Sequence, residues 1–180
     1  MIATYAQLIP FSELAPGQAA RIRADIINEL VKEATLRTKL APDRLVVRDI
    51  RAKDDLTLYS AGTASGVEDW GCKTGTTANA YETLATGTIG DQRWIGFYGV
   101  KLGDNVCTAL KFNIGGADRV IWQLQALREE DDMVGLCVAG IIIPQNIIYT
   151  ISRFVRVASS SAMIVLKGVV VEPRGLVISP

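Results

Sequence analysis

The side chains that most often perform chemistry in proteins are missing from this chain or scattered along it. The sequence has no histidine, which removes the usual general base and the commonest metal ligand, and with them a Ser-His-Asp triad. Carboxylate and lysine mechanisms survive without histidine. Cys72, Cys107 and Cys137 form no CxxC pair, so we expect reduced, partly buried thiols. We expect no catalytic residue, no bound metal and no cofactor.

Acidic residues are the remaining candidates for acid–base or metal chemistry. The run Glu129-Glu130-Asp131-Asp132 offers hard oxygen ligands, but it lacks the alternating ligands and the glycine turn of a calcium loop. We interpret it as a solvated turn between two strands, and a weaker cation contact at a subunit junction stays open. Several other carboxylates could supply a pair for glycoside cleavage, but no spacing selects one: Glu68, Asp69, Glu82, Asp91 and Asp104.

Aromatic residues offer a second kind of site, a platform for stacking sugars. Trp70, Trp94, Trp122 and the tyrosines are the candidates. Trp94, Tyr98 and Trp122 fall at the period-two spacing of strands, which favours core packing over an exposed platform. Trp70 lies in a different setting and keeps both interpretations open.

The second half of the chain supplies the elements that must position any such surface. Six β-branched and aromatic segments follow one another between short Gly, Asp, Ser or Pro turns, a spacing typical of an antiparallel β-sandwich. In one turn, Pro144-Gln145-Asn146, the proline presets φ and the asparagine tolerates a left-handed conformation. The predicted strands are 93–102, 107–114, 118–127, 133–143, 147–157 and 162–171.

The N-terminal region, residues 1–40, reads as an arm followed by one amphipathic helix. Prolines interrupt the first 16 residues, and apolar residues then recur at i, i+4 between Gly17 and Leu40. This stripe comprises Ile22, Ile26, Leu30 and Ala34. Two interpretations stay open: the helix packs on the chain's own sheet, or it docks on a neighbouring subunit.

The sandwich domain, residues 41–180, contains one long segment without clear periodicity. Short strands are predicted at 45–50 and 56–59, joined by a charged turn at 51–55. Residues 61–92 follow as a long loop rich in Gly and Thr, with Trp70 in its middle. Loops of that length in compact domains are usually functional or disordered. Trp70 is either a partner contact or part of a lid over the core edge.

The last predicted strand is apolar on both faces. Ile164, Leu166 and Val170 alternate with residues that must meet a helix, a loop or another chain. With the helix stripe and the long loop, these alternate residues give the candidate subunit contacts: Ile22, Ile26, Leu30, Trp70, Met163, Val165, Val169 and Val171.

Composition argues for assembly and against several partner classes. The 180 residues hold 19 basic and 19 acidic side chains and are 49% hydrophobic, with a mean hydropathy of +0.24. Zero net charge with high apolarity suits a chain that hides surface in an assembly, and it disfavours sequence-specific nucleic-acid binding. The apolar stretch 133–149 is too short and interrupted to span a membrane. The N-terminus lacks the features of a secretory signal.

The C-terminal pattern carries a resemblance. Two buried strands, the Pro144-Gln145-Asn146 turn, the strand from Ile147, the small polar turn 158–162 and a closing strand up to Glu172-Pro173 resemble the closing strands of single jelly-roll virion proteins. These are the capsid cement or decoration proteins and small capsid proteins of tailed phages and related viruses. The resemblance covers residues 93–173. It implies a jelly-roll-like sandwich arranged around a local symmetry axis, without a catalytic residue and with an N-terminal arm that reaches a neighbour.

The expected function is therefore structural rather than enzymatic. The expected partners are other copies of the chain, in a cyclic homo-oligomer with a trimer favoured, and a larger capsid-like shell. The expected location is the virion, assembled in the host cytoplasm. The alternative is a carbohydrate- or receptor-binding β-sandwich module whose site is built from Trp70 and the long loop.

Overall fold

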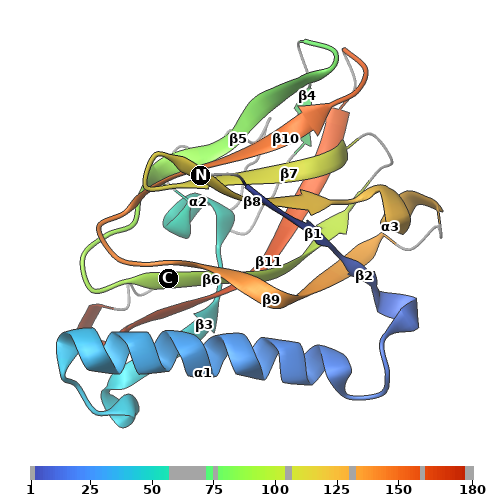
Figure 1. The fold of residues 1–180 in the computed structure, drawn as a ribbon. Coiled ribbons are helices and arrows are strands. Elements are labelled where there is room, and N and C mark those ends of the chain that lie inside the picture. The colour runs from blue at the N-terminus through green and yellow to red at the C-terminus, as the bar shows by residue number, and fades with distance from the viewer. Residues whose placement is uncertain are drawn as a thin grey trace.

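The computed structural model describes residues 3–56, 72–74, 77–103, 107–129, 133–158 and 161–176. Two sheets face each other, and one long helix lies beneath them (Figure 1). The strands are β1 Thr4–Gln7, β2 Ile9–Pro10, β3 Leu45–Asp49, β4 Cys72–Thr74, β5 Ala80–Thr88, β6 Trp94–Leu102, β7 Cys107–Ile114, β8 Ala117–Gln123, β9 Val134–Ile143, β10 Ile148–Val155 and β11 Ser161–Pro173. The helices are α1 Gln18–Thr38, α2 Ala52–Asp55 and α3 Gln125–Glu129. The mainly β sandwich predicted from the sequence is confirmed.

The five-stranded sheet has the order β1-β8-β7-β10-β5, and the six-stranded sheet has the order β2-β9-β6-β11-β3, with β4 added beside β11. The described strands pair antiparallel except β1, which runs parallel to β8. The main core fills the space between the sheets and includes Trp122, Phe97 and Phe112. Its rings meet in tilted and edge-on pairs, with the centroids of Phe112 and Trp122 4.7 Å apart.

The turn predicted between the two strands of the C-terminal half is confirmed. Asn146 adopts φ 59, and its carboxamide donates a hydrogen bond of 3.1 Å to Asp91. Two of the three cysteines also behave as expected, because Cys107 and Cys137 are buried and form no disulfide bond.

The N-terminal arm is part of the sandwich. Its β1 pairs with β8 of one sheet and its β2 with β9 of the other, so residues 4–10 close one edge of the molecule. Leu8 lies between β1 and β2 and is 1% exposed. Ala6 is two residues before it, so both side chains point to the same side of the extended chain, into the core. Residues 4–10 thus pair with strands of their own chain, and contact of the arm with a neighbour stays a prediction.

The segment 61–92 contains a strand where a loop was expected. Residues 80–88 form β5, which pairs with β10 along its length. A bulge opposite Ile151 and Ser152 buries the consecutive residues Leu84 and Ala85, so the period-two pattern that marks a strand is broken. Residues 61–71, with Trp70, lie outside the described residues.

Two shorter predictions also change. The strand predicted at 118–127 ends at Gln123, and α3 follows. Leu124 and Leu127 are both fully buried, and a helical turn places residues three apart on one side. The charged turn predicted at 51–55 contains the short helix α2 and a buried carboxylate, Asp55. Leu56 is outside any strand, and 57–59 lie outside the described residues.

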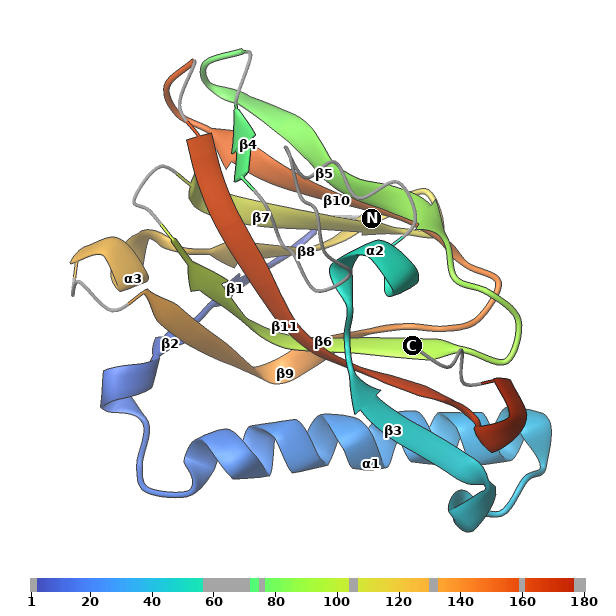
Figure 2. The same cartoon turned by 180° about the vertical axis from the view of Figure 1, so that it is seen from behind.

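The helix α1 covers the outer face of the six-stranded sheet, as Figure 2 shows from behind. Its buried residues Ile26, Leu30 and Ala34 pack against Trp94, Val169 and Val171. Of the two interpretations of the helix, packing on the chain's own sheet is the one observed. The same contact explains why the closing strand is apolar on both faces.

Two glycines let the helix approach the sheet closely. A Cβ on Gly96 would lie 2.7 Å from Ile26 Cγ2 and 2.8 Å from Leu30 Cδ1. A Cβ on Gly140 would collide with Ile26 Cδ1, and Gly140 also has a left-handed φ of 59. Glycine at both positions removes the atom that would push α1 away.

Gly140→Ala should therefore destabilise the fold by about 2–4 kcal/mol, the sum of overpacking and a left-handed alanine. Gly116→Ala is the matched control, because Gly116 also has a positive φ of 80 but has nothing within 4 Å of its Cβ position. Urea denaturation followed by circular dichroism measures both. Equal losses in the two variants would show that α1 does not depend on close approach at Gly140.

Candidate functional site

Most of the residues predicted to contact other subunits are used inside the chain. Ile22, Ile26 and Leu30 are 3%, 1% and 0% exposed, and Val169 and Val171 are 0% exposed beneath α1. Burial leaves Ile26, Leu30, Val169 and Val171 almost no exposed surface for a subunit contact, and Ile22 keeps only the small exposed part that lines a groove beside α1. Met163 and Val165 lie half-buried on β11. Trp70 lies outside the described residues.

Within the part of the chain that the structure describes, no group of three or more Cys, Asp and Glu side chains could hold a metal ion. Glu129 ends α3, and Glu130–Asp132 lie outside the described residues, so the prediction of a solvated turn there stays a prediction. None of the described helices has the length and apolar character to span a membrane. Trp94 and Trp122 are fully buried, which confirms them as core residues.

Four charged side chains form a network that sequence reasoning missed. Arg48 Nε donates to Glu172 Oε1 at 2.8 Å, and both of its terminal nitrogens donate to Asp55, at 2.7 and 2.6 Å. Arg93 Nε donates to Glu172 Oε2 at 2.9 Å, and its Nη1 lies 3.6 Å from Asp55 Oδ1. The two carboxylates are 0% and 1% exposed, and the two guanidinium groups 20% and 18%.

This network joins segments far apart in the sequence: β3, α2, the residue just before β6 and the end of β11. The backbone N–H of Arg51 also donates to Asp55 Oδ2 at 2.7 Å. Hydrogen bonding to Asp55 is the largest cause that raises the pKa of Arg48. Each guanidinium group of this cluster lies beside both carboxylates. The cluster therefore links four segments of the fold, and its two carboxylates are paired rather than available as a catalytic acid or base. Its one signal in the sequence is Glu172, which ends an apolar run.

A second buried charge is less well paired. Arg153, on β10, is 2% exposed, and its nearest carboxylate is Glu82, with Nη2 3.7 Å from Oε2. Nε and Nη2 of Arg153 have no hydrogen-bond partner. Glu82 Oε1 accepts from the backbone of Thr77 at 2.8 Å, so this carboxylate is held in place by the chain.

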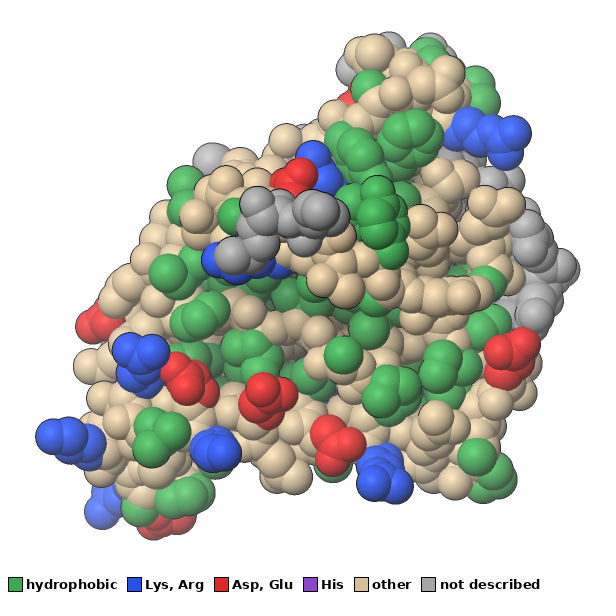
Figure 3. Space-filling model, in the orientation of Figure 1, with side chains coloured by type: hydrophobic (Ala, Val, Ile, Leu, Met, Phe, Trp, Pro, Cys, Tyr) green, Lys and Arg blue, Asp and Glu red, His purple; other side chains and the backbone are tan. Residues whose placement is uncertain are grey.

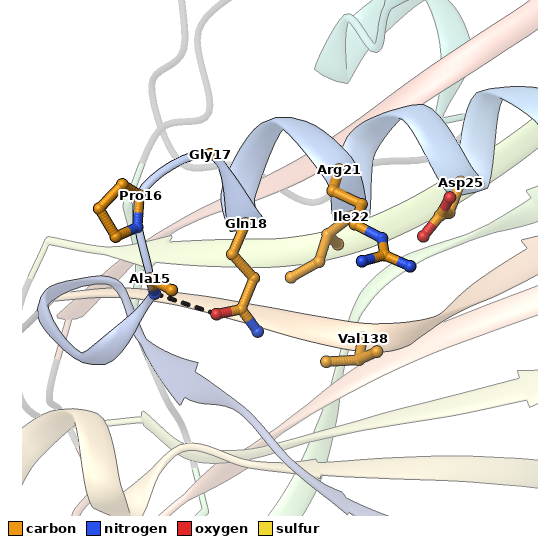
Figure 4. A pocket seen from close by; sticks show the side chains of 8 residues that line it. All are labelled: Ala15, Pro16, Gly17, Gln18, Arg21, Ile22, Asp25 and Val138. Atoms are coloured by element: carbon orange, nitrogen blue, oxygen red, sulfur yellow. Dashed lines mark hydrogen bonds between the residues drawn. The ribbon is translucent and has the colours of Figure 1, made fainter.

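A groove of about 560 Å³ lies between the start of α1 and β9 (Figure 4). Its lining residues are Ala15, Pro16, Gly17, Gln18, Arg21, Ile22, Asp25 and Val138. Gln18 Oε1 accepts a hydrogen bond of 3.0 Å from the backbone of Ala15, which fixes the entry to the helix. Val138 is 58% exposed and lies where four residues of β9, 137–140, stand opposite the single residue Tyr98 of β6. The groove therefore combines apolar walls with one positive and one negative side chain.

The outer face of the five-stranded sheet is not covered by any described helix. We call it the open face, and define it by Tyr81, Lys111, Ile148 and Phe154. The rings of Tyr81 and Phe154 meet edge-on with centroids 5.2 Å apart, and Lys111 Nζ lies 4.7 Å from the Tyr81 centroid. Ile148 is 56% exposed. Hydrophobic side chains gather over β7 and β10 in the upper half of Figure 3.

Charges on the same face are oriented by their neighbours. Asn113 Nδ2 donates to Asp118 Oδ1 at 2.9 Å, and Lys111 Nζ lies 3.2 Å from Asp118 Oδ2. The hydrogen bond from Asn113 is the first cause that lowers the pKa of Asp118. Partial burial raises the pKa of Tyr81. The open face thus presents a cation held between a ring and a carboxylate, beside exposed apolar groups.

Comparison with known proteins gives no relative from which to transfer a role. No protein-family model matches the chain, and the search of curated proteins returned no significant match. Function must therefore be argued from the surfaces described above.

Proposed function

We propose that this protein is a non-enzymatic structural protein that acts through contacts between copies of itself. The observation that carries the proposal is the contrast between the two sheets. The six-stranded sheet is covered by α1, whereas the five-stranded sheet leaves Tyr81 39% and Ile148 56% exposed. Exposed apolar groups rimmed by polar ones are typical of protein interaction surfaces. The neutral net charge adds to this argument, because it gives a free monomer little colloidal protection.

A cyclic oligomer of three or more copies, such as the favoured trimer, needs two different surfaces that fit each other. The chain offers two: the open face, and the groove between α1 and β9 with its exposed Val138. They come from different sheets, so one copy can present the first while the next presents the second. The resemblance of residues 93–173 to capsid cement, decoration and small capsid proteins favours a larger capsid-like shell as the final partner and the virion as the location.

Assembly should depend on both surfaces. Ile148→Glu on the open face and Val138→Glu in the groove should each prevent oligomer formation, because each places a charge in an apolar contact. Leu36→Glu is the matched control, since Leu36 is 66% exposed on α1 and belongs to neither surface. Light scattering coupled to gel filtration, at micromolar concentration, measures the mass.

Mixing the two variants makes the test sharper. Each variant keeps one intact surface, so an equimolar mixture should form a dimer and stop there, because a ring cannot close. A wild-type protein that is a monodisperse monomer without affinity for a larger particle would contradict the proposal. So would full assembly of both glutamate variants.

The alternative function, a carbohydrate- or receptor-binding module, was expected to use Trp70 and the long loop. Trp70 and the rest of 61–71 lie outside the described residues, and residues 80–88 of the predicted loop form β5 instead. A different corner of the molecule supports binding of this kind.

A further inference from the structure

β1, β8 and α3 meet at one corner of the sandwich (Figure 1). A pocket of about 420 Å³ lies there, lined by residues of these three elements. Its volume falls within the range of roughly 300–1,000 Å³ found for small-molecule sites. The lining residues are Tyr5, Gln7, Gln123, Gln125 and Ala126. The pocket thus brings together one aromatic ring, three carboxamides and one methyl group, and none of these side chains carries a charge at neutral pH.

The fold holds these residues in place from beneath. Tyr5 and Gln7 are two apart on β1, so they share a face, and the parallel register sets Gln7 beside Gln123. The alternate residues of the same segments point into the core: Ala6, Leu8, Trp122 and Leu124. On α3, Leu127 is fully buried. The polar residues therefore stand on a packed frame, which lowers the entropy cost of binding a ligand.

The chemistry of this lining selects a class of ligand. Tyr5 is 64% exposed, so its ring is free to cover an apolar surface. Each carboxamide supplies both a donor and an acceptor, which matches a hydroxyl group that must donate and accept. A pyranose has an apolar C–H face and a rim of hydroxyl groups. We propose that this pocket binds a neutral sugar, with the ring of Tyr5 against its C–H face and the carboxamides of Gln7 and Gln123 on its hydroxyl groups.

The absence of charge among the lining residues gives the proposal a selectivity. A uronic acid or a sialic acid would bring a carboxylate into a pocket whose described lining residues offer it no cation, at the cost of removing that carboxylate from water. The site therefore discriminates in favour of neutral sugars. The pocket is formed within one chain, and its residues lie on the same outer side of the five-stranded sheet as the open face. Sugar binding and assembly are therefore measured separately, each with its own variants.

The test uses the intact protein and saturation-transfer difference NMR with methyl glycosides of glucose, galactose, mannose and N-acetylglucosamine, and with methyl glucuronoside as the charged probe. At least one neutral glycoside should receive saturation on its ring protons, and the glucuronoside should receive none. Tyr5→Ala should weaken binding by about three- to tenfold, whereas Tyr5→Phe keeps the ring and should bind nearly as well. Gln123→Glu should also weaken binding.

Tyr81→Ala is the control variant, because Tyr81 is the other exposed tyrosine of the same sheet and does not line the pocket; it should bind like the wild type. The mass of Tyr5→Ala, measured as for the assembly variants, should equal that of the wild type. The proposal is overturned if no neutral glycoside receives saturation, if Tyr5→Ala and Gln123→Glu both bind normally, or if Tyr81→Ala loses binding as much as Tyr5→Ala does.

Discussion

Ile26→Asp should unfold this protein or leave it barely stable, with a loss of about 3–5 kcal/mol in the free energy of unfolding. Ile26 is 1% exposed and touches the positions where Gly96 and Gly140 omit a side chain. An aspartate there would lose the apolar contact and bury a carboxylate. The side chains that pack around Ile26 form a hydrophobic cluster, so the new carboxylate would lose water without gaining an opposite charge from that cluster.

Ala24→Asp is the matched control for this prediction. Ala24 is exposed on the same helix, so the same new charge should cost no more than about 1 kcal/mol, mainly through lower helix propensity. Urea denaturation followed by circular dichroism compares the two. A normal midpoint for Ile26→Asp would mean that α1 is not held against the six-stranded sheet in solution.

The helix shows how much of this fold could be predicted from its residues. The i, i+4 recurrence from Ile22 to Ala34 identified the buried stripe correctly, because periodicity reports which side of a helix is apolar. It left open what covers that stripe, since a helix needs the same apolar stripe to pack on a neighbouring subunit as on the chain's own sheet. The contact between Gly140 and Ile26 shows that the chain's own sheet covers the stripe. These two residues are more than 100 positions apart, so their contact could not be predicted from local periodicity.

The strands were likewise predictable only in part. The segments of the C-terminal half were predicted with boundaries close to those observed, because β-branched residues and turn residues alternate there. β5 was missed because its bulge buries Leu84 and Ala85 in succession, and the usual alternation fails. The arm was misassigned because β1 and β2 are only four and two residues long, too short for a periodic signal.

The surfaces were harder to predict than the elements. Tyr5 and Gln7 lie on the opposite side of β1 from Ala6, but this stretch is too short for its alternation to predict a strand. Their neighbour Gln123 is distant in sequence and joins them only through the parallel register of β1 and β8. The ion network is similar: Arg48, Asp55, Arg93 and Glu172 come from four elements, and each alone looks like an ordinary surface charge.

That network supports the second large prediction. Arg48→Met should lower the free energy of unfolding by about 3–5 kcal/mol, the usual cost of removing one partner from a buried ion pair. Methionine keeps much of the side-chain volume, so the loss comes chiefly from the charges. Asp55 would lose two hydrogen bonds, of 2.7 and 2.6 Å, while its side chain stays 0% exposed. Arg93 would remain 3.6 Å from it, which compensates only in part.

The control is an exposed ion pair formed by Asp49, the residue that follows Arg48, with Arg23. Arg23 Nη2 lies 2.9 Å from Asp49 Oδ1, with the two side chains 43% and 74% exposed. Arg23→Met should therefore cost less than about 1 kcal/mol, and that small effect should fade at about 1 M salt, where the Debye length is ~3 Å. The cost of Arg48→Met should persist in the same salt, because its carboxylate partners are shielded by protein rather than by ions.

Adding Asp55→Asn to Arg48→Met separates charge from packing. Asparagine removes the uncompensated negative charge while keeping the shape of the side chain, so the double variant should be more stable than Arg48→Met alone. Urea denaturation with and without salt measures all four proteins. If Arg48→Met costs no more than Arg23→Met, or if the double variant is less stable than Arg48→Met, the paired charges do not contribute to the free energy of unfolding as proposed. The joining of β3, α2, β6 and β11 would then rest on apolar packing.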